Sequence, residues 1–233
     1  AYAPGLNECG MTLATTIKDE PYRYASGQPV NNWDNKYIGS ARVRYAIEHS
    51  MNVCAVRTLT ETVGLEKGYK YLENFGFTTL VNNDPNYPGM SDIAQATALG
   101  GITRGVYNIE MTAAYAAIAN SGIYTEPLLY TEILDHDGNV LIDNSKPITR
   151  RVLKESTAFL LTSAMQDVIN RGTGTPARLN NMPAAGKTGT TENSTDLWLS
   201  AYTPYYTCSV WTGYDEDKTL EQFWNQSWHE VIW

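Results

Sequence analysis

Residues 184–194 read AAGKTGTTENS, and the run Gly186-Lys187-Thr188 within them fits two kinds of site. It could end a phosphate-binding loop, or it could be a Lys-Thr-Gly strand of an acyl-transfer enzyme. Asn181 stands where the phosphate loop needs its first glycine, and the residues after Lys187 predict strands, whereas that loop runs into a helix. The phosphate interpretation therefore fails, and the acyl-transfer interpretation requires partner motifs elsewhere in the chain.

Strands are gathered late in the chain, and most helices come before them. After the lysine strand, apolar residues alternate on both sides of Thr203-Pro204-Tyr205, which predicts two antiparallel strands. Helical spacing predicts helices over 41–63, 65–75, 108–120 and 154–170. An Asp-Gly pair predicts a hairpin between strands at 128–134 and 140–142. The sequence thus predicts a mixed α/β (α+β) fold, with an antiparallel sheet flanked by helices.

Two long stretches are rich in turn-forming residues. Residues 1–40 are expected to be loop after a short first helix, and residues 78–107 to be loop around a short helix near 93–99. The polar triplet Ser50-Met51-Asn52 interrupts the helical pattern of 41–63 halfway. At the end of the chain, Trp224 and Trp228 have helical spacing and predict a terminal helix.

Composition limits the classes of function. With 233 residues, 42% of them hydrophobic and 18% charged, the chain is expected to be globular, as one domain or a closely packed pair. Its net charge is −8 without a Lys/Arg-rich run, which argues against binding to nucleic acid or anionic lipid. No apolar run approaches the roughly 20 residues of a membrane span, and no signal peptide is visible.

The three cysteines give no sign of a metal site, cofactor site or disulfide framework. Cys9, Cys54 and Cys208 are odd in number and lack ligand spacing, so each is expected to pack as a small apolar side chain. The histidines are equally scattered, and a surface or core position is expected for each.

The acyl-transfer interpretation finds one partner motif. Penicillin-recognising serine enzymes combine S-x-x-K, a second serine motif and K-T-G. Ser50-Met51-Asn52 supplies S-x-N at a helix interruption, well upstream of Lys187. Either motif alone is a weak signal, but their order, separation and predicted contexts support each other.

A resemblance extends beyond these motifs. The chain resembles the transpeptidase domain of penicillin-binding proteins, specifically the bifunctional, class A type. The matching stretches, in family order, are YAPGLNECGMTLATTIKDEP (2–21), NNWDNKYIGSARVRYAIEHSMNVCAVRTL (31–59), ALGGITRGVYNIEMTAAYAAIANSGIY (98–124), RGTGTPARL (171–179), AAGKTGTTENSTDLWLSAYTP (184–204) and VWTGYD (210–215). The resemblance implies a β-lactamase/transpeptidase-like fold and makes 1–233 the C-terminal portion of such a domain.

One element of the family pattern is missing. No S-x-x-K occurs in the chain, and the family carries it at the start of a helix just upstream of the position of YAPGL. The nucleophilic serine and its lysine are therefore expected before Ala1. Thr15-Thr16-Ile17-Lys18 has T-x-x-K spacing and is the alternative nucleophile, although it lies downstream of the expected place, in a turn-rich region.

The resemblance also implies a groove for substrate between Ser50 and Lys187, and roles for the residues that line it. Ser50 would relay a proton, Asn52 would offer its amide to the substrate, and Lys187 would attract the substrate carboxylate. Without the resemblance, Ser50 could simply bond nearby backbone, Asn52 could be an N-cap and Lys187 an exposed strand lysine.

The rest of the lysine strand would hold the substrate. The resemblance gives Thr188 and Thr190 hydroxyls for the carboxylate, and the Thr190 N–H half of an oxyanion hole. Gly189 would let substrate backbone approach, and substrate would lie along 187–191, including Thr191, as an added strand. Aromatic side chains could border the groove or belong to the core: Trp33, Tyr37, Trp198 and Tyr202.

The implied function is that of a peptidoglycan DD-transpeptidase. Such an enzyme transfers the acyl group of D-Ala-D-Ala stem peptides to an amine and is acylated by β-lactams, without a metal or cofactor. It would act outside the bacterial cytoplasmic membrane, with an N-terminal anchor and a glycosyltransferase domain that this sequence lacks. A serine β-lactamase, or a non-catalytic module that binds peptide or β-lactam, is the alternative.

Overall fold

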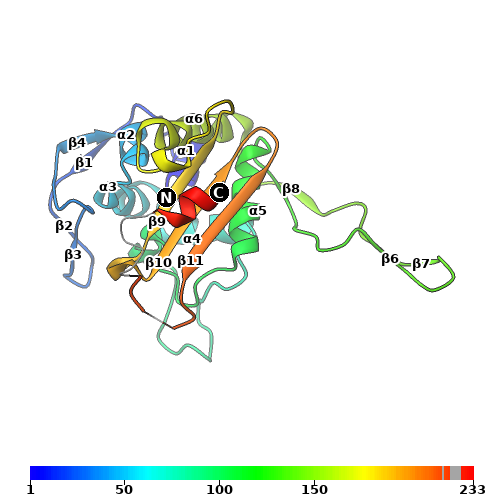
Figure 1. Cartoon of the computed structure of the whole chain (residues 1–233). Helices are drawn as coiled ribbons and strands as arrows, with labels where there is room; N and C mark the ends of the chain where they lie inside the picture. Colours follow the sequence, from blue (N-terminus) through cyan, green and yellow to red (C-terminus); the bar gives the residue numbers. More distant parts are fainter. Residues whose placement is uncertain (217, 221–226) are drawn as a thin grey trace.

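The protein is described by a computed structural model that covers residues 1–216, 218–220 and 227–233. Its α-helices are α1 (Tyr2–Glu8), α2 (Val43–Glu48), α3 (Asn52–Arg57), α4 (Leu65–Asn74), α5 (Asn108–Ala119), α6 (Glu155–Arg171) and α7 (Trp228–Ile232). The other helical segments are the π-helix η1 (Thr58–Val63) and the 3₁₀ turns η2 (Gln95–Leu99), η3 (Thr175–Ala177) and η4 (Glu192–Ser194). Figure 1 shows their arrangement around a central sheet.

The central sheet is built from the strands that follow the Lys-Thr-Gly motif. β9 (Ala185–Thr190), β10 (Asp196–Tyr202) and β11 (Thr207–Gly213) form an antiparallel sheet in the order β11-β10-β9. Lys187 lies opposite Ser200, and Gly186 lies opposite Ala201. Both antiparallel strands predicted after the lysine strand are therefore confirmed.

Helices cover both faces of this sheet. Ala185 and Tyr202 belong to one buried cluster with apolar residues of α5 and α6. Leu199 and Ala201, whose side chains alternate to the opposite face, pack with Trp233 at the end of α7. The mixed α/β fold with an antiparallel sheet flanked by helices is thus confirmed.

The helix predictions are mostly confirmed, and their breaks fall near the predicted places. α2 and α3 are separated at 49–51, and η1 follows α3 directly up to Gly64. α4, α5 and α6 match the predicted helices, and η2 lies in the predicted loop 78–107. The terminal helix is present as α7, which includes Trp228, whereas Trp224 lies outside the described residues.

Residues 1–40 are more ordered than predicted. After α1 they contain β1 (Thr16–Asp19), β2 (Tyr22–Arg23), β3 (Pro29–Val30) and the start of β4 (Gly39–Arg42). β1 pairs with β4, and β2 pairs with β3. The prediction of a loop was wrong here because these strands are two to four residues long and pair across turns, so they carry no alternating pattern.

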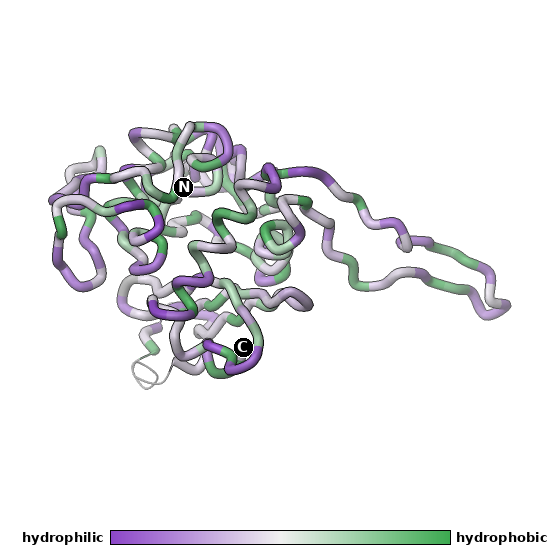
Figure 2. The backbone as a smooth tube through the Cα atoms, turned by 90° about the horizontal axis from the view of Figure 1, so that it is seen from above, coloured by the Kyte–Doolittle hydropathy of each residue, from purple (hydrophilic) through white to green (hydrophobic). Residues whose placement is uncertain are grey.

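The predicted hairpin is present and forms an arm. β6 (Glu132–Leu134) pairs with β7 (Val140–Asp143). The first strand begins at Glu132, later than predicted. β5 (Ile123–Thr125) and β8 (Thr149–Arg151) pair where the arm leaves the body. Figures 1 and 2 show the arm projecting away from all other elements, with hydrophobic segments along it.

The cysteine prediction holds only in part. Cys54 is buried, but Cys9 is half-buried and Cys208 is exposed. Cys208 lies on β11, which is an edge strand of the sheet in the described part of the chain.

Candidate active site

Ser50 lies in the break between α2 and α3. Its φ of 53° is left-handed, which few side-chain-bearing residues adopt. The Met51 N–H donates to the Ala46 carbonyl at 2.9 Å and closes the turn beneath it. The half-buried serine side chain therefore leaves the helical path and projects from a turn whose backbone is fixed on both sides.

Lys187 on β9 meets this turn. Its Nζ donates to Ser50 Oγ at 2.7 Å and to the Thr188 carbonyl oxygen at 2.9 Å. Burial lowers the pKa of Lys187 from 10.5 to about 8. Its two acceptors are a hydroxyl and a carbonyl, so neither offers a full negative charge to offset the loss of water. The exposed-strand alternative for Lys187 is therefore wrong.

β9 has a free edge beside Lys187. In the described part of the chain, the sheet order places β10 on one side of β9 and no strand on the other. The Thr191 N–H donates to the Asp196 carbonyl, toward β10, at 3.2 Å. Because successive residues of a strand alternate sides, the Thr190 and Thr188 backbone groups point to the free edge. The Thr190 N–H is thus oriented as an oxyanion-hole donor would need to be.

The side chains after Lys187 differ in what they contact. Thr188 Oγ1 forms a hydrogen bond with Thr173 Oγ1 at 2.7 Å, and Thr190 is exposed. The Thr191 hydroxyl accepts from the Asp196 N–H at 2.8 Å and bonds Thr195 Oγ1 at 2.8 Å. Thr191 is therefore engaged in the β9–β10 turn, whereas Thr188 bonds Thr173 and Thr190 is exposed.

The two glycines of this strand serve different purposes. A Cβ on Gly186 would collide with the Cβ of Ala201 on β10, so this position needs glycine for strand packing. A Cβ on Gly189 would lie 3.3 Å from the Trp198 Cβ, a tight but not prohibitive approach.

A loop before α2 flanks the Ser50 turn. Asn52 Nδ2 donates to the Asn31 carbonyl at 2.9 Å, and Trp33 Nε1 donates to the His49 carbonyl at 3.1 Å. Trp33 is 68% exposed and so borders the turn from the solvent side. The N-cap alternative for Asn52 is wrong, because Met51 holds the N-cap position and Asn52 is the first helical residue.

The other aromatic candidates lie in different environments. Tyr37 is 36% exposed and its hydroxyl donates to Asn31 Oδ1 at 3.2 Å, in the same loop as Trp33. Trp198 is half-buried beside Trp211. Tyr202 is only 4% exposed and bonds Thr162 in the core, so it does not border the groove.

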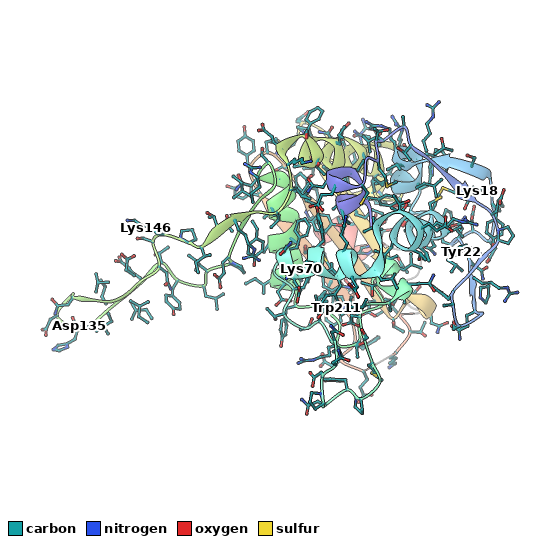
Figure 3. All side chains as sticks on the ribbon, turned by 180° about the vertical axis from the view of Figure 1, so that it is seen from behind. Lys18, Tyr22, Lys70, Asp135, Lys146 and Trp211 are labelled. Atoms are coloured by element: carbon teal, nitrogen blue, oxygen red, sulfur yellow. The ribbon has the colours of Figure 1, made fainter. Side chains whose placement is uncertain are left out.

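The T-x-x-K alternative lacks its structural context. Thr16–Asp19 is strand β1, and Lys18 is exposed at the rim of the molecule, as Figure 3 shows. Thr15 Oγ1 accepts from the Thr12 N–H at 2.8 Å. Because the motif requires the start of a helix, Thr15 is not positioned as a nucleophile.

Three residues of the site were missed from the sequence. Glu48 lies just before the Ser50 turn, and Arg171 and Thr173 connect it to β9. The stretch RGTGTPARL contains the last two, but its composition reads only as a helix end followed by a turn.

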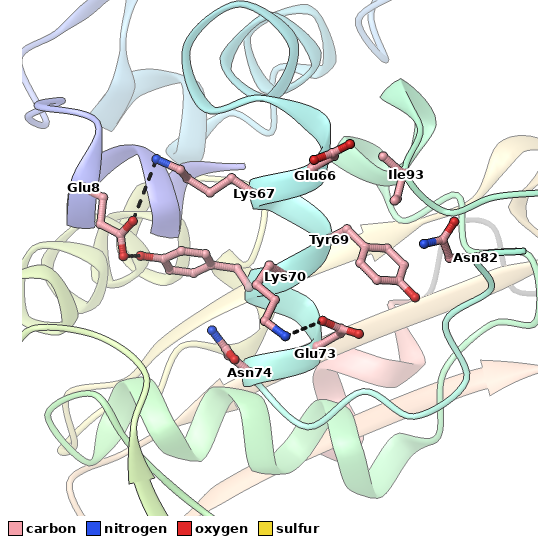
Figure 4. A pocket seen from close by; sticks show the side chains of 10 residues that line it. Glu8, Glu66, Lys67, Tyr69, Lys70, Glu73, Asn74, Asn82 and Ile93 are labelled. Carbon is pink, nitrogen blue, oxygen red and sulfur yellow. Dashed lines mark hydrogen bonds and ion pairs between the residues drawn. The ribbon is translucent and has the colours of Figure 1, made fainter.

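A separate groove lies away from the Ser50 turn and β9. It has a volume of about 730 Å³ and is lined mainly by α4, together with Glu8, Asn82 and Ile93 (Figure 4). Four of its charged side chains form two ion pairs, Lys67 with Glu8 at 3.8 Å and Lys70 with Glu73 at 2.9 Å. Neither Ser50 nor Lys187 lines this groove.

The K-T-G strand and the S-x-N turn meet through the hydrogen bond between Lys187 and Ser50. Penicillin-recognising serine enzymes combine these two motifs in their sites. A family model described as the penicillin binding protein transpeptidase domain matches residues 1–223. Penicillin-binding protein 1A of Clostridium acetobutylicum is 36% identical over 244 residues, which cover 99% of this chain and 29% of that protein. Penicillin-binding protein 1A of Streptococcus pneumoniae is 35% identical over 239 residues, covering 94% and 32%.

The chain therefore belongs to the penicillin-binding protein transpeptidase family, and spans about a third or less of the length of these relatives. The fold is shared with PonA1 from Mycobacterium tuberculosis, solved in complex with penicillin V, at a TM-score of 0.81 and 23% identity over 93% of this chain and 58% of that one. None of the helices among the described residues is long and apolar enough to cross a membrane.

Proposed function

We propose that this chain is the C-terminal portion of the transpeptidase domain of a bifunctional, class A penicillin-binding protein. The S-x-x-K serine and lysine would be supplied by residues that precede Ala1, and this chain together with those residues is called the extended domain below. The domain would transfer the acyl group of D-Ala-D-Ala stem peptides to an amine and so cross-link peptidoglycan. β-Lactams would acylate the same serine.

In the whole protein, the proposed context is the outer face of the bacterial cytoplasmic membrane. A membrane anchor and a glycosyltransferase domain would precede the extended domain. The length of the relatives, of which this chain covers 29–32%, leaves room for both.

The observation that carries the proposal is the 2.7 Å hydrogen bond from Lys187 Nζ to Ser50 Oγ. It joins two motifs that lie 137 residues apart in the sequence. Because Lys187 donates in this bond, the hydroxyl hydrogen of Ser50 is available to another acceptor. Ser50 can therefore give its hydroxyl proton to the leaving amine and take up the proton that the S-x-x-K serine loses when it attacks.

The free edge of β9 supports the mode of substrate binding. A stem peptide added along 187–191 would find the outward backbone groups of Thr190 and the Thr188 N–H, whereas the Thr188 carbonyl already accepts from Lys187 Nζ. The Thr190 N–H would stabilise the oxyanion, and the Lys187 ammonium and the Thr188 and Thr190 hydroxyls would hold the carboxylate. Trp33 would border the bound substrate above the Ser50 turn, and Asn52 would offer its amide to the peptide.

Intact-mass analysis after incubation with benzylpenicillin tests the proposal. The extended domain should gain one stable adduct on the S-x-x-K serine, and a Ser→Ala variant at that position should gain none. An adduct that is rapidly hydrolysed would indicate a β-lactamase. Retention of penicillin without an adduct would indicate a non-catalytic binding module, and both results would contradict the transpeptidase assignment.

A further inference from the structure

The end of α2, directly before the Ser50 turn, is tied to the end of α6. The Glu48 side chain is 9% exposed, and its Oε2 accepts from Arg171 Nε at 3.1 Å. The Glu48 carbonyl accepts from the Thr173 N–H at 3.4 Å. Gly172 passes so close to this carbonyl that a Cβ there would collide with it. Residues 171–173 therefore hold Glu48 by its side chain and its backbone.

The same segment also reaches the lysine strand. Thr173 Oγ1 bonds Thr188 Oγ1 at 2.7 Å, next to Lys187. Lys187 in turn bonds Ser50 at 2.7 Å. These contacts close a ring in which the segment 171–173 bridges the two halves of the site. The separation of Ser50 from Lys187 thus depends on where this segment holds α2.

Several charged side chains lie near Glu48, and their burial shows that its carboxylate is the group most affected by the loss of a partner. Arg171 and His49 face its carboxylate, with His49 Nε2 at 3.3 Å from Oε1. On α6, Asp167 pairs with Arg171 at 3.0 Å and with Arg44 of α2 at 2.6 Å. The Arg171 side chain is 60% exposed, so its attraction for Glu48 is screened. The buried carboxylate, by contrast, loses the hydrogen bond from Arg171 Nε if Arg171 is removed.

We propose that Glu48 and Arg171 are positioning residues that set the distance between the Ser50 hydroxyl and the Lys187 ammonium. They touch no substrate and act through Ser50, and this role rests on the proposed function. Without Arg171, the Glu48 carboxylate keeps His49 beside it but loses the Arg171 hydrogen bond, so it turns toward water and the end of α2 follows it. The Ser50–Lys187 bond then lengthens although both residues remain.

Acylation kinetics of the extended domain with benzylpenicillin test the pair. Arg171→Gln and Glu48→Gln should lower the second-order rate constant about tenfold or more, because a shift near 1 Å can cost up to about 100-fold. Arg171→Lys keeps the cation and should restore most of the rate. Glu73→Gln, which breaks the Lys70–Glu73 pair on α4, is the matched control and should leave the rate unchanged.

A readout without acylation separates this proposal from the proposed function. Because Trp33 Nε1 donates to the His49 carbonyl, its indole N–H resonance reports the position of the Ser50 turn. Arg171→Gln should shift that resonance, and Glu73→Gln should not. Failure of the wild-type extended domain to acylate would overturn the proposed function alone. An unshifted resonance together with a wild-type acylation rate in Arg171→Gln would overturn the positioning role.

Discussion

Ser50 combines a proposed chemical role with a demanding backbone conformation. Its left-handed φ of 53° costs a side-chain-bearing residue about 1–2 kcal/mol. Glycine would adopt this backbone conformation without that cost, so the serine side chain must serve another purpose. The 2.7 Å bond from Lys187 gives the reason that the serine is there. Both residues follow from the motifs in the sequence. Their partners Glu48, Arg171 and Thr173 do not, because ion pairs and hydroxyl contacts across the fold leave no local pattern.

Two substitutions of Ser50 separate these roles. Ser50→Ala and Ser50→Gly should each lower the benzylpenicillin acylation rate of the extended domain about 100-fold or more, since a positioned proton carrier contributes about that much. Ser50→Gly should be more stable than Ser50→Ala by about 1 kcal/mol, because glycine accepts the left-handed backbone. Stopped-flow acylation and urea unfolding measure the two effects. A glycine variant that acylates like wild type would rule out the relay.

The pKa of Lys187 predicts a pH dependence. Burial disfavours the charged lysine and lowers its pKa to about 8. The ammonium, which in the proposed function would attract the carboxylate, is therefore present below that pH and lost above it. The wild-type acylation rate constant should therefore fall as the pH rises through about 8. Lys187→Met should be slower at pH 7 and should lack this step, which the ratio of the two pH profiles measures. An unchanged ratio from pH 7 to 9 would contradict the assigned role.

At the scale of the elements, β9 is defined by what lies on each of its edges. Its packing against β10 was predictable, because alternating apolar residues follow the motif. Its other edge carries no strand among the described residues, and only the resemblance, which placed substrate there as an added strand, led to that expectation, since strand order depends on contacts far apart in the chain. The strands β1 to β4 escaped prediction because each is only two to four residues long and so carries no alternating pattern. β1 pairs with β4 across about 20 residues of turn formers.

The spacing between β9 and β10 should tolerate little change. Gly186→Ala inserts a methyl group against Ala201 and should destabilise the extended domain by about 1–3 kcal/mol, as overpacking typically does. Gly189→Ala is the control, because its new Cβ would meet Trp198 only at 3.3 Å and should cost less. Denaturant unfolding ranks the two variants. Equal stabilities would mean that Gly186 does not set the strand spacing.

At the scale of the whole molecule, the arm contributes little to the core. All residues of β6 and β7 are exposed, as is Leu129 before them, and Figure 3 places Asp135 and Lys146 far from the body. The Asp-Gly turn predicted the hairpin because turn chemistry is local. Its projection from the body was not predictable, since an alternating pattern does not say what the apolar face meets.

Removing the arm should leave the site intact. Replacing residues 128–146 by a short Gly/Ser linker keeps the Glu126 N–H bond to the Ile148 carbonyl at 2.9 Å, and should change the melting temperature by less than about 4 °C. The acylation rate should stay unchanged. Leu153→Ala, at a side chain only 1% exposed, is the contrasting control and should cost about 2–5 kcal/mol. A loss of acylation on removing the arm would show that it supports the site.

The central claim is that the Ser50 turn and the free edge of β9 form one site for an acyl group. A crystal structure of the extended domain after reaction with benzylpenicillin tests it most directly. The account predicts an adduct along β9, with its carbonyl oxygen accepting from the Thr190 N–H and its carboxylate near Lys187, Thr188 and Thr190. An adduct on Thr15, or density only in the groove along α4, would contradict it.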